Sequence, residues 1–102
     1  MEMTQHLKPL YIKATFDGVP IIHVLIDNDA TVNILLMKIV RKLGKSEKYL
    51  IDTEILVTRF DGNKAHAKGV IPVTLWVGSS SSIASFFVVN GTLSYNALRG
   101  RD

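Results

Sequence analysis

The sequence predicts an all-β protein, a small closed barrel built from hairpins, with one short α-helix. Two Asp-Gly pairs, at residues 17–18 and 61–62, each separate two stretches with strand patterns, and Asp-Gly is a typical two-residue hairpin turn. Only the stretch from Leu36 to Leu43 instead has apolar residues at helical spacing. With 102 residues, 47% of them hydrophobic and 21% charged, the chain suits a single globular domain.

The first hairpin is predicted to run from Leu10 to Ile26. Apolar and polar residues alternate up to Phe16, Asp17-Gly18 supplies the turn, and the second strand begins at Val19. Pro20 lies near the start of that strand, where a missing amide N–H is tolerated. We therefore expect these two strands to pair with each other.

A short amphipathic helix is predicted after residue 33. Its apolar face consists of Leu36, Ile39, Val40 and Leu43, and its basic face of Lys38, Arg41, Lys42 and Lys45. Gly44 is placed to end the helix, and Thr31 or Asn33 is expected to cap its start by accepting bonds from the first free amides. The basic residues then form a solvated surface.

The second half of the chain is predicted to consist of strands and turns. A second hairpin is expected from Ile51 to Phe60 and from Ala65 to Val77, around the turn Asp61-Gly62-Asn63, with its returning strand broken by Gly69 and Pro72. The remaining segments are a turn at 78–82, a buried strand at 83–89, a loop at 90–94 and a last strand and turn at 95–100.

Composition argues against several classes of protein. The chain has no cysteine, which excludes disulfides and thiol chemistry, and its three scattered histidines show no ligand spacing, so no metal or cofactor is assigned. No membrane span or signal peptide is predicted, and an intracellular setting is expected. The net charge of +3 is small and no aromatic residues are interleaved with the basic ones, so nucleic-acid binding by a small β-barrel is kept only as a third function class.

The most unusual stretch runs from His23 to Leu35, where an apolar strand leads directly into acidic and amide side chains. The strand carries Asp27 toward the interior, and polar residues follow it up to Asn33. One interpretation is ordinary loop and helix-capping chemistry. The other is the active-site turn of an aspartic protease, in which a strand ends in Asp, a small polar residue, Gly, and Ala or Ser.

Taken as a whole, the chain resembles the protease domain of plant long-terminal-repeat retrotransposon polyproteins, a branch of the retropepsin-like aspartic proteases. Segments similar to those of the family occur in the family's order at Pro9 to Ala14, Phe16 to Pro20, Val24 to Leu35, Phe60 to Gly62, Gly69 to Val73, Phe86 to Val89 and Ser94 to Leu98. This ordered agreement favours the active-site interpretation.

The resemblance implies a retropepsin-like acid protease fold and an aspartic endopeptidase that cleaves an extended polypeptide. It implies a homodimer in which Asp27 of each chain is catalytic, because each chain supplies one such carboxylate. The active-site loop would then contain Asn28, Asp29 and Ala30, with Asn28 bracing the two loops across the dimer.

The same resemblance assigns the part of the second hairpin from Ile55 to Gly69 as a flap that closes over the substrate, with Phe60, Asp61 and Gly62 as flap and substrate-binding residues. The family continues past Gly-Arg-Asp into a helix and a terminal strand. Residues 1–102 are therefore expected to be a single protease domain truncated at its C-terminus.

The chain departs from the family pattern at three positions. Asp29 stands where the family has Gly, and it is expected to strain the turn and impair activity. Leu36 stands at a usual Pro, and Arg99 places a charge where a buried apolar residue is expected. The alternative function is therefore a catalytically inactive module of the same fold, used for dimerisation or peptide binding.

Overall fold

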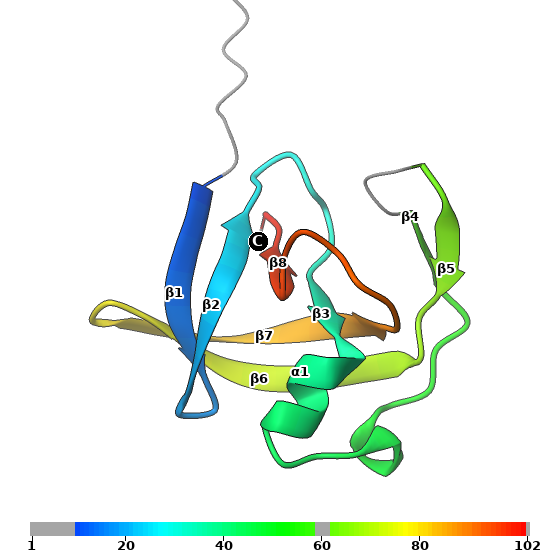
Figure 1. The fold of residues 1–102 in the computed structure, drawn as a ribbon, viewed down its shortest axis with the longest axis horizontal. Coiled ribbons are helices and arrows are strands. Elements are labelled where there is room, and N and C mark those ends of the chain that lie inside the picture. The colour runs from blue at the N-terminus through cyan, green and yellow to red at the C-terminus, as the bar shows by residue number, and fades with distance from the viewer. Residues whose placement is uncertain (1–9, 59–61, 102) are drawn as a thin grey trace, which may run out of the picture.

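In the computed structural model, which describes residues 10–58 and 62–101, six strands close into a barrel. Around the barrel the strands are β1 (Leu10–Phe16), β2 (Val19–Ile26), β8 (Ala97–Arg99), β3 (Ile34–Leu36), β7 (Ser80–Val89) and β6 (Gly69–Val77) (Figure 1). Outside it are the two-stranded sheet of β4 (Leu56–Thr58) and β5 (Lys64–His66), the helix α1 (Met37–Lys42) and the 3-10 helix η1 (Glu47–Tyr49). The predicted closed barrel with one short α-helix is confirmed. In the described ranges no helix is long or apolar enough to cross a membrane.

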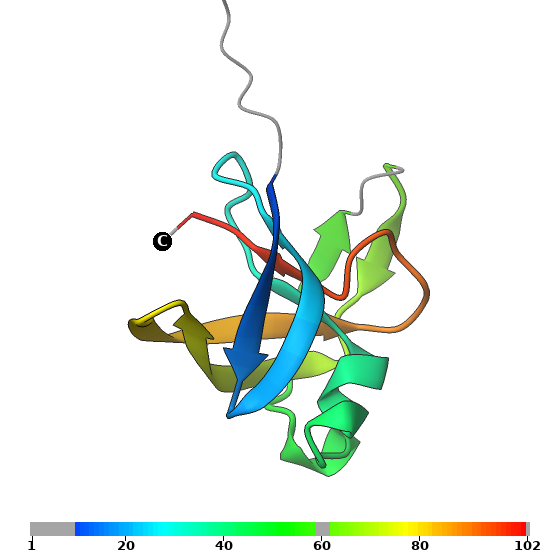
Figure 2. The same cartoon turned by 60° about the vertical axis from the view of Figure 1, so that its left-hand side comes forward.

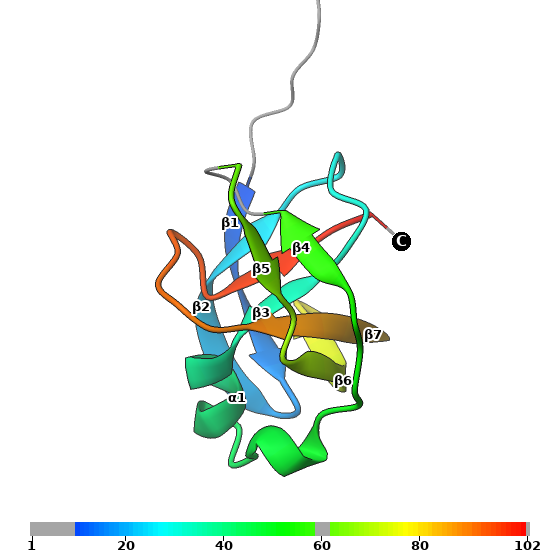
Figure 3. The same cartoon turned by 90° about the vertical axis from the view of Figure 1, so that its right-hand side faces the viewer.

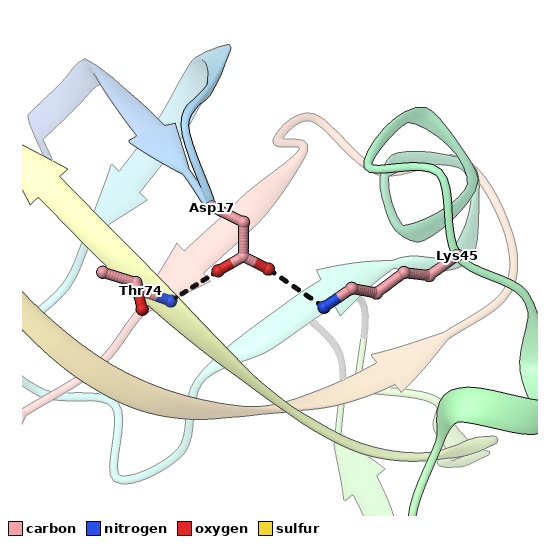
Figure 4. Close-up of polar contacts among 3 residues, drawn as sticks. All are labelled: Asp17, Lys45 and Thr74. Carbon is pink, nitrogen blue, oxygen red and sulfur yellow. Dashed lines mark hydrogen bonds and ion pairs between the residues drawn. The ribbon is translucent and has the colours of Figure 1, made fainter.

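The first hairpin forms as predicted. Strands β1 and β2 pair in antiparallel fashion, and both turn residues have positive φ, 52° at Asp17 and 85° at Gly18, as a two-residue hairpin with the twist of its strands requires. The carboxylate of Asp17 accepts a bond from the amide of Thr74 at 2.8 Å and pairs with the ammonium of Lys45 at 3.1 Å (Figure 4). The hairpin turn is thereby tied to β6 and to the segment that follows α1.

The segment between the first hairpin and α1 differs from its prediction. Ile34 to Leu36 form β3, which pairs with β7 in parallel and with β8 in antiparallel fashion, so the helix begins only at Met37. Its N-cap residue is Leu36, without a side-chain cap bond, so the expectation that Thr31 or Asn33 caps the helix is wrong. The predicted end is confirmed, because Gly44 takes a φ of +82° directly after the last turn.

The strands of the second half have different bounds from those predicted. In the described part of the strand expected from Ile51 to Phe60, residues 51–58, only Leu56–Thr58 pairs as a strand, and Ile51 itself makes a single bridge to Val70. The returning strand is divided into β5 and β6 just before Gly69, where a Cβ would lie 2.6 Å from that of Leu50. The predicted turn at 78–82 is confined to residues 78 and 79, since β7 begins at Ser80.

The core lies inside the barrel and beneath α1. Phe16 and Phe86, both fully buried, pack with ring centroids 5.4 Å apart, and α1 buries Met37, Ile39 and Val40 against the barrel while its basic residues face solvent. Figures 1 and 2 show α1 and η1 at one end of the barrel. The loop that joins β2 to β3 lies at the opposite end, where the candidate site is found.

Candidate active site

Asp27 lies at the point where β2 leaves the barrel wall. Val24 and Leu25 are buried, Ile26 and Asp27 are partly buried, and the chain then turns away. The amide of Asp27 donates to the carbonyl of Arg99 at 3.1 Å, which continues the parallel pairing of β2 with β8 by one residue. The apolar strand therefore places the carboxylate at the rim of the barrel, with its backbone held by β8, and not in the interior toward which the strand was expected to carry it.

The turn after Asp27 orients its carboxylate. The amide of Ala30 donates to the backbone carbonyl of Asp27 at 3.1 Å, and the amide of Asp29 donates to Asp27 Oδ1 at 3.0 Å. One carboxylate oxygen is thus fixed by the protein, while the group as a whole stays partly exposed. A carboxylate held in this way can present its other oxygen to water or to a partner group.

Asn28 and Asp29 are exposed and Ala30 is partly buried, so the predicted loop residues surround Asp27 on the solvent side. Asp29 is not among the described non-glycine residues with positive φ, which are Asp17 and His23. The turn therefore does not place Asp29 in the left-handed region, and the expected backbone strain at this position is absent.

Residues 99–101, which we call the anchoring segment, hold the backbone of the candidate active-site loop through hydrogen bonds. Besides the bond from Asp27 to Arg99, the amide of Arg101 donates to the carbonyl of Ala30 at 2.8 Å, and that of Gly100 donates to Asn33 Oδ1 at 2.8 Å. Gly100 is buried, and a Cβ there would lie 2.4 Å from a loop oxygen. The loop and the anchoring segment are in direct backbone contact.

Sequence reasoning missed the part that Asn33 plays. Its carboxamide accepts bonds from Gly100 and from Arg99 and donates to the carbonyl of Ser85 at 3.0 Å, so it joins the loop to β8 and to β7. These partners lie 52 to 67 residues away in the chain. The only signal in the sequence was an amide residue near a carboxylate, which is equally typical of a helix cap.

The predicted flap is the hairpin of β4 and β5, in which Val57 lies opposite Ala65. Phe60 and Asp61 fall outside the described residues, and Gly62 is exposed with a φ of +83°. Figures 1 and 3 show that this hairpin rises from the same end of the molecule as the loop that carries Asp27. The fold brings the two predicted parts of a peptide-binding site to one end of the barrel.

The candidate site offers carboxylates as its acid–base groups. In residues 10–58 and 62–101, no three His, Cys, Asp or Glu side chains come together as a metal-binding group. The carboxylate of Asp27 lies at the end of β2 and is held by the turn that follows. One carboxylate per chain supplies either the acid or the base of a general acid–base pair, but not both at once.

A scan against protein-family models finds no match, and a search of curated proteins finds no relative. The fold, however, is similar to solved structures. The retroviral protease-like domain of Ddi1 from Leishmania major matches with a TM-score of 0.68 and 15% identity, over 92% of this chain and 73% of that one. A retropepsin-like aspartic protease from Rickettsia conorii matches with a TM-score of 0.64 and 25% identity, over 90% of this chain and 66% of that one. The chain has the retropepsin-like fold, and the likeness supports a protease domain.

Proposed function

We propose that this chain is the aspartic endopeptidase domain of a retrotransposon polyprotein, which cleaves an extended polypeptide as a homodimer with one Asp27 from each chain. The observation that carries the proposal is the placement of Asp27 at the end of β2, with Oδ1 held by the amide of Asp29, in a barrel of retropepsin-like fold. The retrotransposon origin rests on the ordered sequence resemblance.

The reaction needs two carboxylates that share one proton across a water molecule. One carboxylate removes a proton from the water, and the protonated one polarises the peptide carbonyl that the water attacks. Two carboxylates this close do not both ionise, because the like charges repel each other. An isologous dimer brings Asp27 of each chain to the two-fold axis and supplies both groups from a single sequence position.

The remaining parts of the site would hold the substrate and the dimer. Asn28, exposed at the tip of the turn, would brace the two loops against each other across the axis. The hairpin of β4 and β5 would cover an extended peptide and pair with it as a strand pairs with a sheet edge. Specificity would come from the pockets that two chains form together.

The test is cleavage of a broad peptide library at acid pH by the parent and by Asp27→Asn, with the oligomeric state measured at each concentration. Asp27→Asn should abolish cleavage, whereas Asp52→Asn, which removes an exposed carboxylate outside the site, should leave it unchanged. Specific activity should fall as the protein is diluted below its dimerisation constant, and the pH profile should be bell-shaped, with limbs that belong to the pair. Cleavage that survives Asp27→Asn contradicts the assignment.

The alternative is a catalytically inactive module of the same fold, and the observation that favours it is Asp29 at the position of the family's Gly. This alternative predicts a protein that dimerises or binds extended peptides without cleaving them. A dimer that leaves the whole library uncut at every pH, while a peptide still binds, would support the module and refute the endopeptidase.

A further inference from the structure

The side chain of Asn33 makes three hydrogen bonds at the base of the candidate active-site loop. Oδ1 accepts from the amide of Gly100 at 2.8 Å and from Nη1 of Arg99 at 3.2 Å, and Nδ2 donates to the carbonyl of Ser85 at 3.0 Å. Donor and acceptor ends are both engaged with partners of the matching kind, so the carboxamide is fixed in one orientation.

The guanidinium of Arg99 completes this arrangement. Arg99 is partly buried, and Nη1 lies between Asn33 Oδ1 at 3.2 Å and the carbonyl of Gly100 at 3.4 Å. A partly buried cation needs acceptors to offset its lost hydration, and Asn33 supplies one. The charge that departs from the family's apolar pattern is therefore matched by a polar side chain on the loop that it faces.

Hydrogen bonds of the anchoring segment connect Asn33 and Arg99 to Asp27, the candidate catalytic residue. The backbone carbonyl of Arg99 accepts from the amide of Asp27 at 3.1 Å, and the Gly100 amide bound by Asn33 is the next N–H along the chain. Asn33 and Arg99 thus act on both ends of the turn, since Asp27 begins it and Asn33 ends it. Both side chains are therefore linked by hydrogen bonds to the segment that holds Asp27.

We propose that Asn33 and Arg99 form a positioning pair, which fixes the position and direction of the Asp27 carboxylate through the anchoring segment. The proposal rests on the function proposed above, because the position of Asp27 matters for rate only if Asp27 is catalytic. Displacing a catalytic group by about 1 Å lowers rates by up to ~100-fold. The pair accounts for Arg at position 99 as part of the site.

A purely structural role for the same bonds makes different predictions. If Asn33 and Arg99 only stabilise the barrel, their loss lowers the stability of the whole protein and leaves the activity of the folded fraction unchanged. If they position Asp27, their loss lowers kcat of the folded dimer with little effect on KM, because substrate contacts elsewhere are kept. The two bonds to one acceptor also predict that the effects of the two side chains are not additive.

The experiment compares the parent with Asn33→Ala, Arg99→Gln, their combination, and Arg99→Lys, all as folded dimers. Arg41→Gln is the control, since it removes the same charge from the exposed face of α1 at the far end of the barrel (Figure 1). We expect Asn33→Ala and Arg99→Gln each to lower kcat by about 10- to 100-fold, with KM changed by less than about 3-fold. The combined variant should be no slower than the slower single variant. Arg99→Lys should recover part of the rate that Arg99→Gln loses. Unchanged kcat, or additive losses, overturns the proposal.

Amide hydrogen exchange tests the pair without any need for activity. The amides of Asp27, Gly100 and Arg101 should exchange at least about 10-fold faster in Asn33→Ala and in Arg99→Gln, while amides in the middle of β6 and β7 keep their parent rates. Equal acceleration across the barrel, or none in the anchoring segment, overturns the proposal. A parent that cleaves nothing but shows the local acceleration refutes the protease function and leaves the positioning of Asp27 established, so the two failures are distinguishable.

Discussion

Replacing Gly100 with alanine is expected to destabilise the protein by roughly 3 kcal/mol through a clash with the backbone of the candidate active-site loop. A Cβ at this position would lie 2.4 Å from the carbonyl oxygen of Val32 and 2.8 Å from that of Ala30. Both atoms belong to the backbone, so no flexible side chain can move aside. The φ of Gly100 is not in the left-handed region, and the expected cost is therefore one of contact and not of conformation.

The size of the expected destabilisation follows from the backbone displacement that the added methyl group requires. To bring the shorter contact to the 3.0 Å that real Cβ atoms respect, the loop and the anchoring segment must separate by about 0.6 Å or more. Overpacking of this kind costs about 1–3 kcal/mol. The separation also stretches the bonds from Gly100 to Asn33 and from Arg101 to Ala30, each worth about 1 kcal/mol.

Urea unfolding of the parent, Gly100→Ala and Gly44→Ala measures this difference. Gly44 is the matched control, because its φ of +82° strains any other residue while nothing lies within 4 Å of an added Cβ. Alanine there should cost only about 1–2 kcal/mol, the penalty of the left-handed region alone. If Gly100→Ala is no less stable than Gly44→Ala at an equal m-value, the loop and the anchoring segment are not in close backbone contact.

Three further changes have defined outcomes. Asp29→Asn and Asp29→Gly should raise kcat of the dimer to a similar extent in the peptide-library assay, because both remove the charge. Asp17→Asn and Lys45→Met should each lower the free energy of unfolding, measured in urea, by less than about 1 kcal/mol, because each removes only the ion pair. Asp17→Ala should lower it by about 2 kcal/mol, because it also removes the acceptor of the Thr74 amide and strains the left-handed backbone. The hydrogen bond and charge of Lys68 lower the pKa of Glu47, so this pair stabilises the protein above the unfolded pKa and loses its effect as pH falls through the folded one. Lys68→Met should raise the pKa of Glu47 in an NMR titration.

The sequence predicted those parts of the fold that depend on short-range chemistry. The first hairpin follows from Asp17-Gly18, whose residues tolerate the positive φ values that the turn needs. The end of α1 follows from Gly44 for the same reason. The strand β3 could not be predicted, because three consecutive buried residues, Ile34 to Leu36, fit the beginning of an apolar helix face as well as a short strand buried on both sides.

The position of Asp27 in the candidate site could be predicted from the sequence, but the hydrogen bonds that hold its loop in place could not. An apolar strand that ends in Asp27 is visible in the sequence, and the resemblance gave it a role. The support consists of pairings between residues far apart in the chain, such as that of Asn33 with Gly100 over 67 residues, which depends on the register of β8 between β2 and β3. No local pattern distinguishes an Asn that binds a distant amide from an Asn that caps the next helix, and the expected cap was accordingly wrong.

The geometry of the loop changes the physical reason for which Asp29 would impair catalysis. Its amide donates to Asp27 Oδ1, a bond that any residue other than proline can make, and its φ is not left-handed, so the backbone does not require Gly here. What Asp29 adds is an exposed carboxylate two residues from Asp27 in each chain, and a dimer would gather four acids around one water. Further negative charge there disfavours the state in which one proton is shared between the catalytic pair, because like charges repel. Asp29→Asn keeps the size of the side chain and removes its charge, so it separates this effect from obstruction of the substrate. Recovery with Asp29→Gly but not with Asp29→Asn would show that the bulk of the side chain blocks the approach of the peptide and that charge is not the cause.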